Sequence, residues 1–348
     1  FRADGSSRFG ENNKYGYFPS FALGWKINEE EFIPDVFNEL KLRTSWGETG
    51  NQGIGNYQSL STYQVGTYVA LNDNLFRGVA PSRMGNPNLK WERTAQFNLG
   101  LDIGIINGRL SGSFDFFDKK TTDLLIALPI PSGTGFNSIT SNVGSVRNHG
   151  FEFLINSTNI NTENFEWSTS FNFSAIKNEV IDLGDSESII NEFTIIEEGS
   201  PLNSYYGYEI TGIFQQGDDI ANSSQPSSQT GYPIFKDLNG DNRITSDDRQ
   251  ILGDPFPDFT YGLQNTLRYK RFGLDFFIQG QEGVELVNRN VIESMYPLNF
   301  GRNRIAEQVL NRWTPQNTQT KWPSGVSPTA YGGGQLNSLT IQNSTVEL

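Results

Sequence analysis

Strict alternation of apolar and polar residues is the feature of this sequence that most constrains its fold. In the segment 95–103, every odd position is apolar and every even position is polar or glycine. In the segment 165–175, Phe165, Trp167, Phe171 and Phe173 share one parity, and glutamate, serine and asparagine residues fill the other. Since successive side chains of a β-strand point to opposite faces, each segment predicts a strand with one apolar and one polar face. The same alternation recurs in 15–27, 40–46, 109–116 and 259–269, and in 274–279 apart from Phe277, which breaks the polar face.

The connections between these segments alternate in length. Short ones follow the strands that end near 27, 103, 155 and 269, and long ones cover 47–91, 119–146, 177–257 and 280–338. Short turns on one side and long loops on the other are typical of an outer-membrane barrel, whose tilted strands cross the bilayer with about 9–11 residues. The pattern therefore predicts an all-β fold, a fragment of a transmembrane antiparallel β-barrel with about ten strands and long extracellular loops.

A soluble β-sandwich or propeller is the alternative, because its strands also bury one face and alternate in the same way. Two observations favour the membrane barrel. Long structureless connections are uncommon in soluble sandwiches. Aromatic residues also gather near the strand ends, as the interface girdles of a barrel require, at Tyr15, Trp25, Trp46, Trp91 and Trp167.

Composition excludes several classes of function. The net charge of -13 argues against nucleic acid as a partner, since that binding needs clustered Lys and Arg. With no Cys and one His, the chain has no disulfide framework, no Cys-ligated zinc, no iron–sulfur cluster and no multi-His metal site. No run of about 18 apolar residues predicts a transmembrane helix.

Six short motifs, in this order along the chain, resemble the signatures of SusC/RagA-type TonB-dependent outer-membrane transporters. They are RADGSSRFG with YGYFPS (2–20), LKLRTSWGETGNQ (40–52), NPNLKWE (86–92), NHGFEF (148–153), YYGY (205–208) and PDFTYG (257–262). Each motif is short, but together they extend over most of the chain. The chain is similar to the C-terminal part of the barrel of this family.

The resemblance implies a plugged barrel of 22 strands in the outer membrane of a Gram-negative, Bacteroidetes-like bacterium, surrounded by outer-membrane lipid. It implies import of oligosaccharides or peptides, with a SusD-like surface lipoprotein as a lid and the TonB–ExbB–ExbD complex as the energy source. Residues 1–348 would then form only a C-terminal portion of the barrel. We expect the plug, the TonB box and the final strands to lie outside this sequence. No covalent chemistry is needed, so the resemblance does not imply an enzyme.

The segment 237–248 has the D-x-N-x-D spacing of a calcium loop, in which side chains at loop positions 1, 3, 5 and 12 and a carbonyl at position 7 supply oxygen ligands. Asn242 stands where such loops usually have Gly, and an Asp holds position 12, where Glu is usual. A solvated acidic turn is the alternative. We expect a structural Ca²⁺ that would order the loop region 177–257. Its predicted ligands are Asp237, Asn239, Asp241, the carbonyl of Arg243, Thr245 and Asp248.

Tyrosines in the long loops are the candidate contacts for a ligand or for the lid, because sugar rings and peptides both pack on aromatic faces. Packing within the loops is the alternative for each of them. The candidates are Tyr57, Tyr63 and Tyr68 in the first long loop, and Tyr205, Tyr206 and Tyr208 in the third.

Two other functions remain open at this level. One is a soluble, calcium-stabilised carbohydrate-binding β protein. The other is a glycan hydrolase, which would need two carboxylates held about 5–10 Å apart across a cleft. The one histidine is His149. The chain has no G-x-S-x-G motif that would supply a nucleophilic serine, so we expect no catalytic triad. The sequence does not distinguish between oligosaccharide and peptide as cargo.

Overall fold

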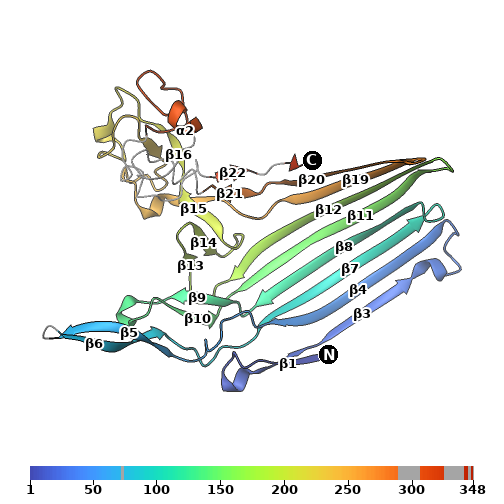
Figure 1. Cartoon of the computed structure of the whole chain (residues 1–348), viewed down its shortest axis with the longest axis horizontal. Coiled ribbons are helices and arrows are strands. Elements are labelled where there is room, and N and C mark those ends of the chain that lie inside the picture. Colours follow the sequence, from blue (N-terminus) through green and yellow to red (C-terminus); the bar gives the residue numbers. More distant parts are fainter. Residues whose placement is uncertain (72–73, 289–305, 325–340, 344–345, 348) are drawn as a thin grey trace.

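The computed structural model describes residues 1–71, 74–288, 306–324, 341–343 and 346–347. Its centre is an antiparallel sheet of nine strands in the order β23-β20-β19-β12-β11-β8-β7-β4-β3, so that the strands follow one another across the sheet in chain order. Figure 1 shows the long strands side by side. The strands are β3 (Ser20–Lys26), β4 (Phe37–Asn51), β7 (Glu92–Ile105), β8 (Leu110–Thr122), β11 (Ser145–Asn161), β12 (Phe165–Asp182), β19 (Phe259–Tyr269), β20 (Phe272–Glu282) and β23 (Val346–Glu347).

One face of this sheet is apolar across all the long strands. One row of the register shows this. Across neighbouring strands it aligns, in order, Leu42, Leu101, Phe114, Phe153 and Phe173. These rows stay uncovered: Phe114 is 48% exposed, and no second layer of the described residues packs on them. A soluble sandwich would need a second sheet on this face. We call it the outward face, because a continuous uncovered apolar band is what a barrel presents to lipid.

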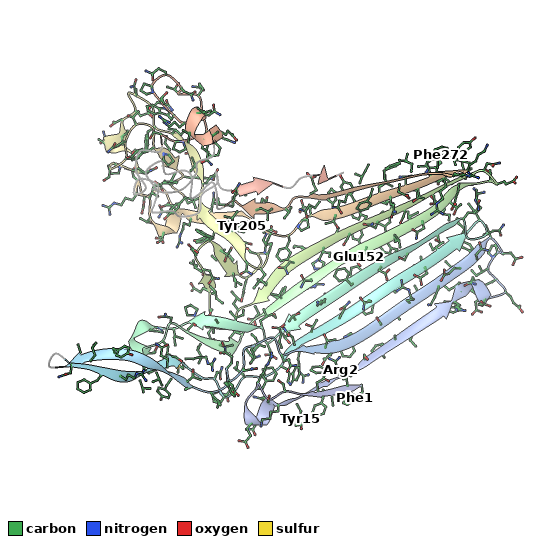
Figure 2. The ribbon with its side chains drawn as sticks, in the orientation of Figure 1. Phe1, Arg2, Tyr15, Glu152, Tyr205 and Phe272 are labelled. Atoms are coloured by element: carbon green, nitrogen blue, oxygen red, sulfur yellow. The ribbon has the colours of Figure 1, made fainter. Side chains whose placement is uncertain are left out.

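The opposite face, here called the inner face, is mostly polar. The register aligns Ser45 with Asn98, Asp102 with Ser113, and Asn156 with Ser170. Figure 2 shows Glu152, which pairs with Asp115 on this face, near the middle of the sheet. The alternation in the sequence is therefore realised as two faces with different chemistry, and the prediction of strands with one apolar and one polar face is confirmed.

The short turns lie at one end of the sheet and the long connections at the other (Figure 1). Phe272, at the turn between β19 and β20, marks the short-turn end in Figure 2. The long connections have structure of their own: hairpins and small sheets. Their elements are β5 (Thr62–Leu71), β6 (Asn74–Arg83), β9 (Leu125–Pro129), β10 (Ser138–Asn142), β13 (Ser188–Ile190), β14 (Thr194–Glu197), β15 (Ser204–Tyr208), β16 (Ile210–Ile213), β17 (Pro233–Phe235), β18 (Arg249–Gly253), β21 (Glu285–Val287) and β22 (Ile341–Asn343).

The remaining elements are a short N-terminal hairpin and a few helical turns. The hairpin is β1 (Arg2–Gly5) and β2 (Tyr15–Phe18). The helical turns are η1 (Glu11–Asn13), η2 (Ile27–Glu29), η3 (Ser132–Thr134), η4 (Ile220–Asn222), η5 (Ser246–Asp248) and α2 (Ala306–Asn311). Within the described ranges, no helix has both the length and the apolar character needed to cross a membrane. Of the fourth long connection, 280–338, residues 289–305 and 325–338 lie outside the described residues.

The strands are longer than the alternation predicts. β11 has 17 residues and β12 has 18, against the expected 9–11. β12 continues to Asp182, so the third connection runs from 183 to 258 and not from 177 to 257. The expected boundary was wrong because the outward positions of β12 change from Phe173 and Ala175 to Lys177 and Glu179. The strand nevertheless continues to pair with β11 in regular register to Val180, and a bulge follows before Asp182.

Two small cores lie where the strands leave the apolar band. The first joins the N-terminal hairpin to the first long connection, through Phe9, Phe18, Ile54, Leu89 and Trp91. The second attaches the third connection to the extended ends of β11 and β12, through Val146, Val180, Leu183, Ile189 and Ile196. Val180 and Leu183 are fully buried. These cores order the loop end of the sheet, where the candidate contact residues lie.

Candidate functional site

An ionic cluster on the inner face joins three neighbouring strands. The guanidinium of Arg43 on β4 donates two hydrogen bonds to Asp102 on β7, at 2.7 and 2.8 Å. Its Nη2 also lies 3.0 Å from Asp115 on β8. Gly100 makes room for this cluster, because a Cβ there would lie 2.7 Å from Arg43 Cζ and would overlap a carboxylate oxygen of Asp115. The inner face is thus polar, charged and cross-linked between strands at this level.

Sequence reasoning missed this cluster. Arg43 and Asp102 are 59 residues apart and Arg43 and Asp115 are 72 residues apart, so only the strand register brings them together. The alternation does place all three residues on the polar face of their strands. It does not show which residues of neighbouring strands lie opposite one another, so it could not predict the cluster.

The first three candidate tyrosines are on or beside the hairpin of β5 and β6, which extends away from the main sheet (Figure 1). Tyr63 is 67% exposed and Tyr68 is 59% exposed. Tyr57 precedes the hairpin with a φ of 61°, and its carbonyl accepts a hydrogen bond from Arg83 Nη2 at 2.7 Å. These rings are therefore available to a ligand or to a partner protein.

The other three candidates are on β15, within a four-stranded sheet of the third connection, and the structure does not bring them to the β5–β6 hairpin (Figure 2). Tyr208 packs against Phe235, with ring centroids 5.3 Å apart, and Arg249 lies over the ring of Tyr206 at 4.9 Å. Burial raises the pKa of Tyr205 and that of Tyr208. All three side chains are half-buried, so packing accounts for much of their surface.

The calcium-type loop folds as a series of turns closed by its own side chains. Asp237 accepts hydrogen bonds from the backbone N–H groups of Gly240 and Asn242, at 2.7 and 2.9 Å. Asn239 accepts from the N–H of Asp241, and Asp241 accepts from the N–H of Arg243. Asn242 has a φ of 59°, the conformation for which such loops usually use Gly.

Asp248 holds the end of this loop and is fully buried. Its carboxylate accepts hydrogen bonds from the N–H groups of Leu238 and Thr245, at 2.9 and 2.6 Å, and Thr245 in turn caps η5. Burial acts to raise the pKa of Asp248, but these backbone donors outweigh it and hold the pKa below its ordinary value. A carboxylate at this position therefore has a structural role in closing the loop.

The donor set of the loop is all oxygen, as Ca²⁺ requires. However, no group of three or more His, Cys, Asp or Glu side chains in the described part of the chain is arranged to hold a metal ion. In this conformation, the carboxylates of the three aspartates Asp237, Asp241 and Asp248 accept hydrogen bonds from backbone N–H groups. Calcium binding stays a prediction.

His149 is within β11, in the middle of a paired strand. Its register partners are Asp118 on β8 and Lys177 on β12. Nδ1 is buried with no hydrogen-bond partner among the described residues. A triad would need a serine oriented by this ring, and the register offers none.

The comparisons identify the fold that this geometry represents. Residues 1–204 match the family model described as TonB dependent receptor-like, beta-barrel. The chain belongs to this family. TonB-dependent receptor P3 of Formosa agariphila is 39% identical over 336 residues, which are 92% of this chain and 33% of that protein. TonB-dependent receptor SusC of Bacteroides thetaiotaomicron is 38% identical over 302 residues, or 80% of this chain and 28% of that protein.

The solved structures agree with the sequence relatives. The structure of the RagAB peptide transporter superposes with a TM-score of 0.79 and 30% identity, covering 99% of this chain and 37% of that chain. The SusC/RagA-type TonB-dependent receptor barrel and its place in the outer membrane are therefore confirmed. The chain spans about a third of the length of these relatives, so it represents part of a larger barrel.

Proposed function

We propose that this chain forms part of the barrel wall and extracellular loops of an importer for oligosaccharides or peptides. The observation that carries the proposal is the division of the sheet into an uncovered apolar face and a polar face with the Arg43–Asp102–Asp115 cluster. A wall with these two faces separates lipid from a hydrophilic path. The family assignment supports transport in place of catalysis.

Import through such a barrel needs energy and a means of holding the cargo at the surface. We infer that the TonB–ExbB–ExbD complex supplies the energy through parts of the receptor beyond this chain. A SusD-like surface lipoprotein would act as the lid over the loop end. The similarity to the structure of the RagAB peptide transporter supports an importing role.

The β5–β6 hairpin is the surface we assign to the lid or to the ligand. Besides Tyr63 and Tyr68, it exposes apolar side chains on both strands, and an exposed apolar patch of this kind usually marks an interaction site. Sugar rings and peptides can both pack on the tyrosines, so oligosaccharide and peptide are both retained as cargo. The exposed apolar residues are Val65, Leu75, Phe76 and Val79.

Growth and uptake separate the two cargo classes. A strain without the gene should lose growth on an oligosaccharide mixture or on a peptide mixture as the limiting nutrient, and the full-length gene should restore it. The lost class identifies the cargo. Unchanged growth on both mixtures, with no lipoprotein co-purifying with the full-length receptor, would contradict the proposed import.

The role of the hairpin has its own test. Tyr63→Ser with Tyr68→Ser should leave the receptor folded, because both rings are exposed, and should reduce uptake or lid co-purification several-fold. The matched control is Tyr15→Ser, which removes a ring that is 71% exposed from the N-terminal hairpin. If the double change and the control change had equal effects, the hairpin would not be part of the binding surface.

A further inference from the structure

The apolar band of the outward face ends, on its loop side, in two rows of charged residues. The row of Phe116 and Phe151 is followed by a row that aligns Asp118 with His149 and Lys177. The next row aligns Lys120 with Arg147 and Glu179. All these positions have the parity of Phe114 and Phe116, so the charges are on the face that meets lipid.

Aromatic residues mark the same level of the sheet. Trp46 pairs with Phe97, and Phe97 pairs with Asp118, so the indole stands in the first charged row. The ring of Phe21 stacks on Trp46 with centroids 5.9 Å apart. Tryptophan gathers at the boundary between acyl chains and headgroups, and Lys and Arg extend their charges to that boundary. The charged rows are therefore at the headgroup level.

A hollow of about 540 Å³ lies at this boundary. Trp46, Phe97 and Phe116 form an apolar part that is continuous with the band, while Asp118, Lys120 and Arg147 line the polar part. An amphipathic molecule with an apolar chain and a charged head matches this division. A soluble anion would leave the apolar part uncovered.

The charge balance of the hollow favours an anionic head. Arg147 donates two hydrogen bonds to Asp118, at 2.9 and 2.6 Å, so these two charges offset each other. Lys120 is exposed and makes no ion pair with any residue in the described ranges. The hollow thus has one uncompensated positive charge, and the guanidinium beside it is fixed in orientation by its carboxylate.

We propose that this hollow binds the phosphate-bearing head of an outer-leaflet lipid, with Lys120 and Arg147 at the phosphate and an acyl chain along Trp46, Phe97 and Phe116. Arg offers planar donors to phosphate, and Lys adds a mobile charge. The inference rests on the outer-membrane location and not on the proposed cargo. Its failure would leave the import proposal untouched, and the reverse also holds.

Native mass spectrometry of the full-length receptor in detergent tests the proposal with lipid A and with dephosphorylated lipid A as probes. Wild-type receptor should retain the phosphorylated lipid preferentially. Lys120→Gln should lower that retention about fivefold, the factor that corresponds to about 1 kcal/mol per basic residue at a charged lipid surface. Transport should not change.

Lys119→Gln is the matched control. Lys119 is the next residue of β8 but faces inward, where it pairs with Gln96 and Asn148. Its loss removes the same charge and should leave lipid retention at the wild-type level. Equal losses in both variants would overturn the proposal, as would equal retention of the two lipids. Displacement of the lipid by excess inorganic phosphate alone would also overturn it, since the site would then be one for free phosphate.

Discussion

At the scale of single residues, the inner face is organised by contacts that cross strands. Arg43 reaches two carboxylates because Gly100, between them, has no side chain. Asp102 and Asp115 would repel each other without the guanidinium, so the three side chains depend on one another. A change at Gly100 therefore tests the cluster without removing any of its charges.

Gly100→Ala should destabilise the barrel by about 1 kcal/mol, because the added methyl group displaces the guanidinium and the Asp115 carboxylate from each other. The matched control is Gly24→Ala on β3, which also faces Arg43 in the register but whose Cβ would meet its nearest atom, Lys41 Cε, at 3.5 Å. Urea unfolding of the full-length receptor in detergent gives the comparison. Equal midpoints for the two variants would show that the cluster tolerates a side chain there.

Calcium binding to 237–248 is also decided by single residues. We expect Ca²⁺ to raise the melting temperature of the full-length receptor and a chelator to reverse the rise. Asp241→Asn should weaken binding about tenfold or more, since ligand charge tunes calcium affinity. Asp247→Asn removes the same charge from the same loop at position 11, which is not a predicted ligand, and should have little effect. Absence of any binding heat in a calcium titration would contradict the predicted site.

The stability of the third connection should depend on pH through the protonation of Glu209. The hydrogen bond from Lys236, at 2.7 Å, and the one from Gln250, at 2.6 Å, lower the pKa of this carboxyl below its ordinary value of 4.5. A lowered pKa means that the stabilisation is complete above the unfolded pKa and is lost as the pH falls through the folded pKa. The pair is exposed, so the effect should be small.

Hydrogen exchange, corrected for intrinsic rates, measures this dependence in peptides from β16 and β18. Protection should decrease as the pH falls below about 4.5. Glu209→Gln should show less protection at neutral pH and a flatter profile. A profile identical to that of the wild type would assign the pH dependence to other carboxyls.

At the scale of elements, the alternation predicted the long strands and their two faces. Side chains alternate between the faces of a strand, so a shift of one residue would place all apolar side chains on the other face, and the sequence pattern therefore specifies the faces strongly. The strand ends could not be predicted. Beyond the apolar band, both faces of β12 are polar or mixed, as at Lys177 and Asn178, so the periodic signal fades while the backbone pairing continues. The loop hairpins were also missed, because strands such as β5 and β6 expose apolar groups without a regular alternation.

The extended end of β12 anchors the third connection, and we expect a change in its buried side chains to loosen that connection. Val180 is fully buried against the third connection, whereas Ile181 is 37% exposed on the opposite face. Val180→Ala should destabilise the docking of this connection by about 1–2 kcal/mol through the cavity it leaves. Ile181→Ala, one residue away, should cost little. Limited proteolysis within 183–258 gives the readout, and similar cleavage rates in the two variants would mean that β12 does not anchor the connection.

At the scale of the whole molecule, the sheet divides space in two directions. Its faces separate the lipid side from the interior of the barrel, and its ends separate the short turns from the long loops (Figure 1). Two-faced strands alone would also suit a sandwich, and the sidedness of the connections is what distinguishes the barrel. The orientation in the membrane follows, with the loops outside the cell and the short turns in the periplasm.

Single cysteines can test this orientation, because the chain has no Cys of its own. Ser227→Cys, in the third connection, and Glu163→Cys, in the turn between β11 and β12, both replace exposed side chains. A membrane-impermeant maleimide added to intact cells should label the first and spare the second, and both should react after the outer membrane is opened. Because both positions are exposed to solvent and both should react once the membrane is opened, a difference in intact cells reports the side of the membrane. Labelling of the turn in intact cells would reverse the orientation and, with it, the assignment of the loops to the captured ligand.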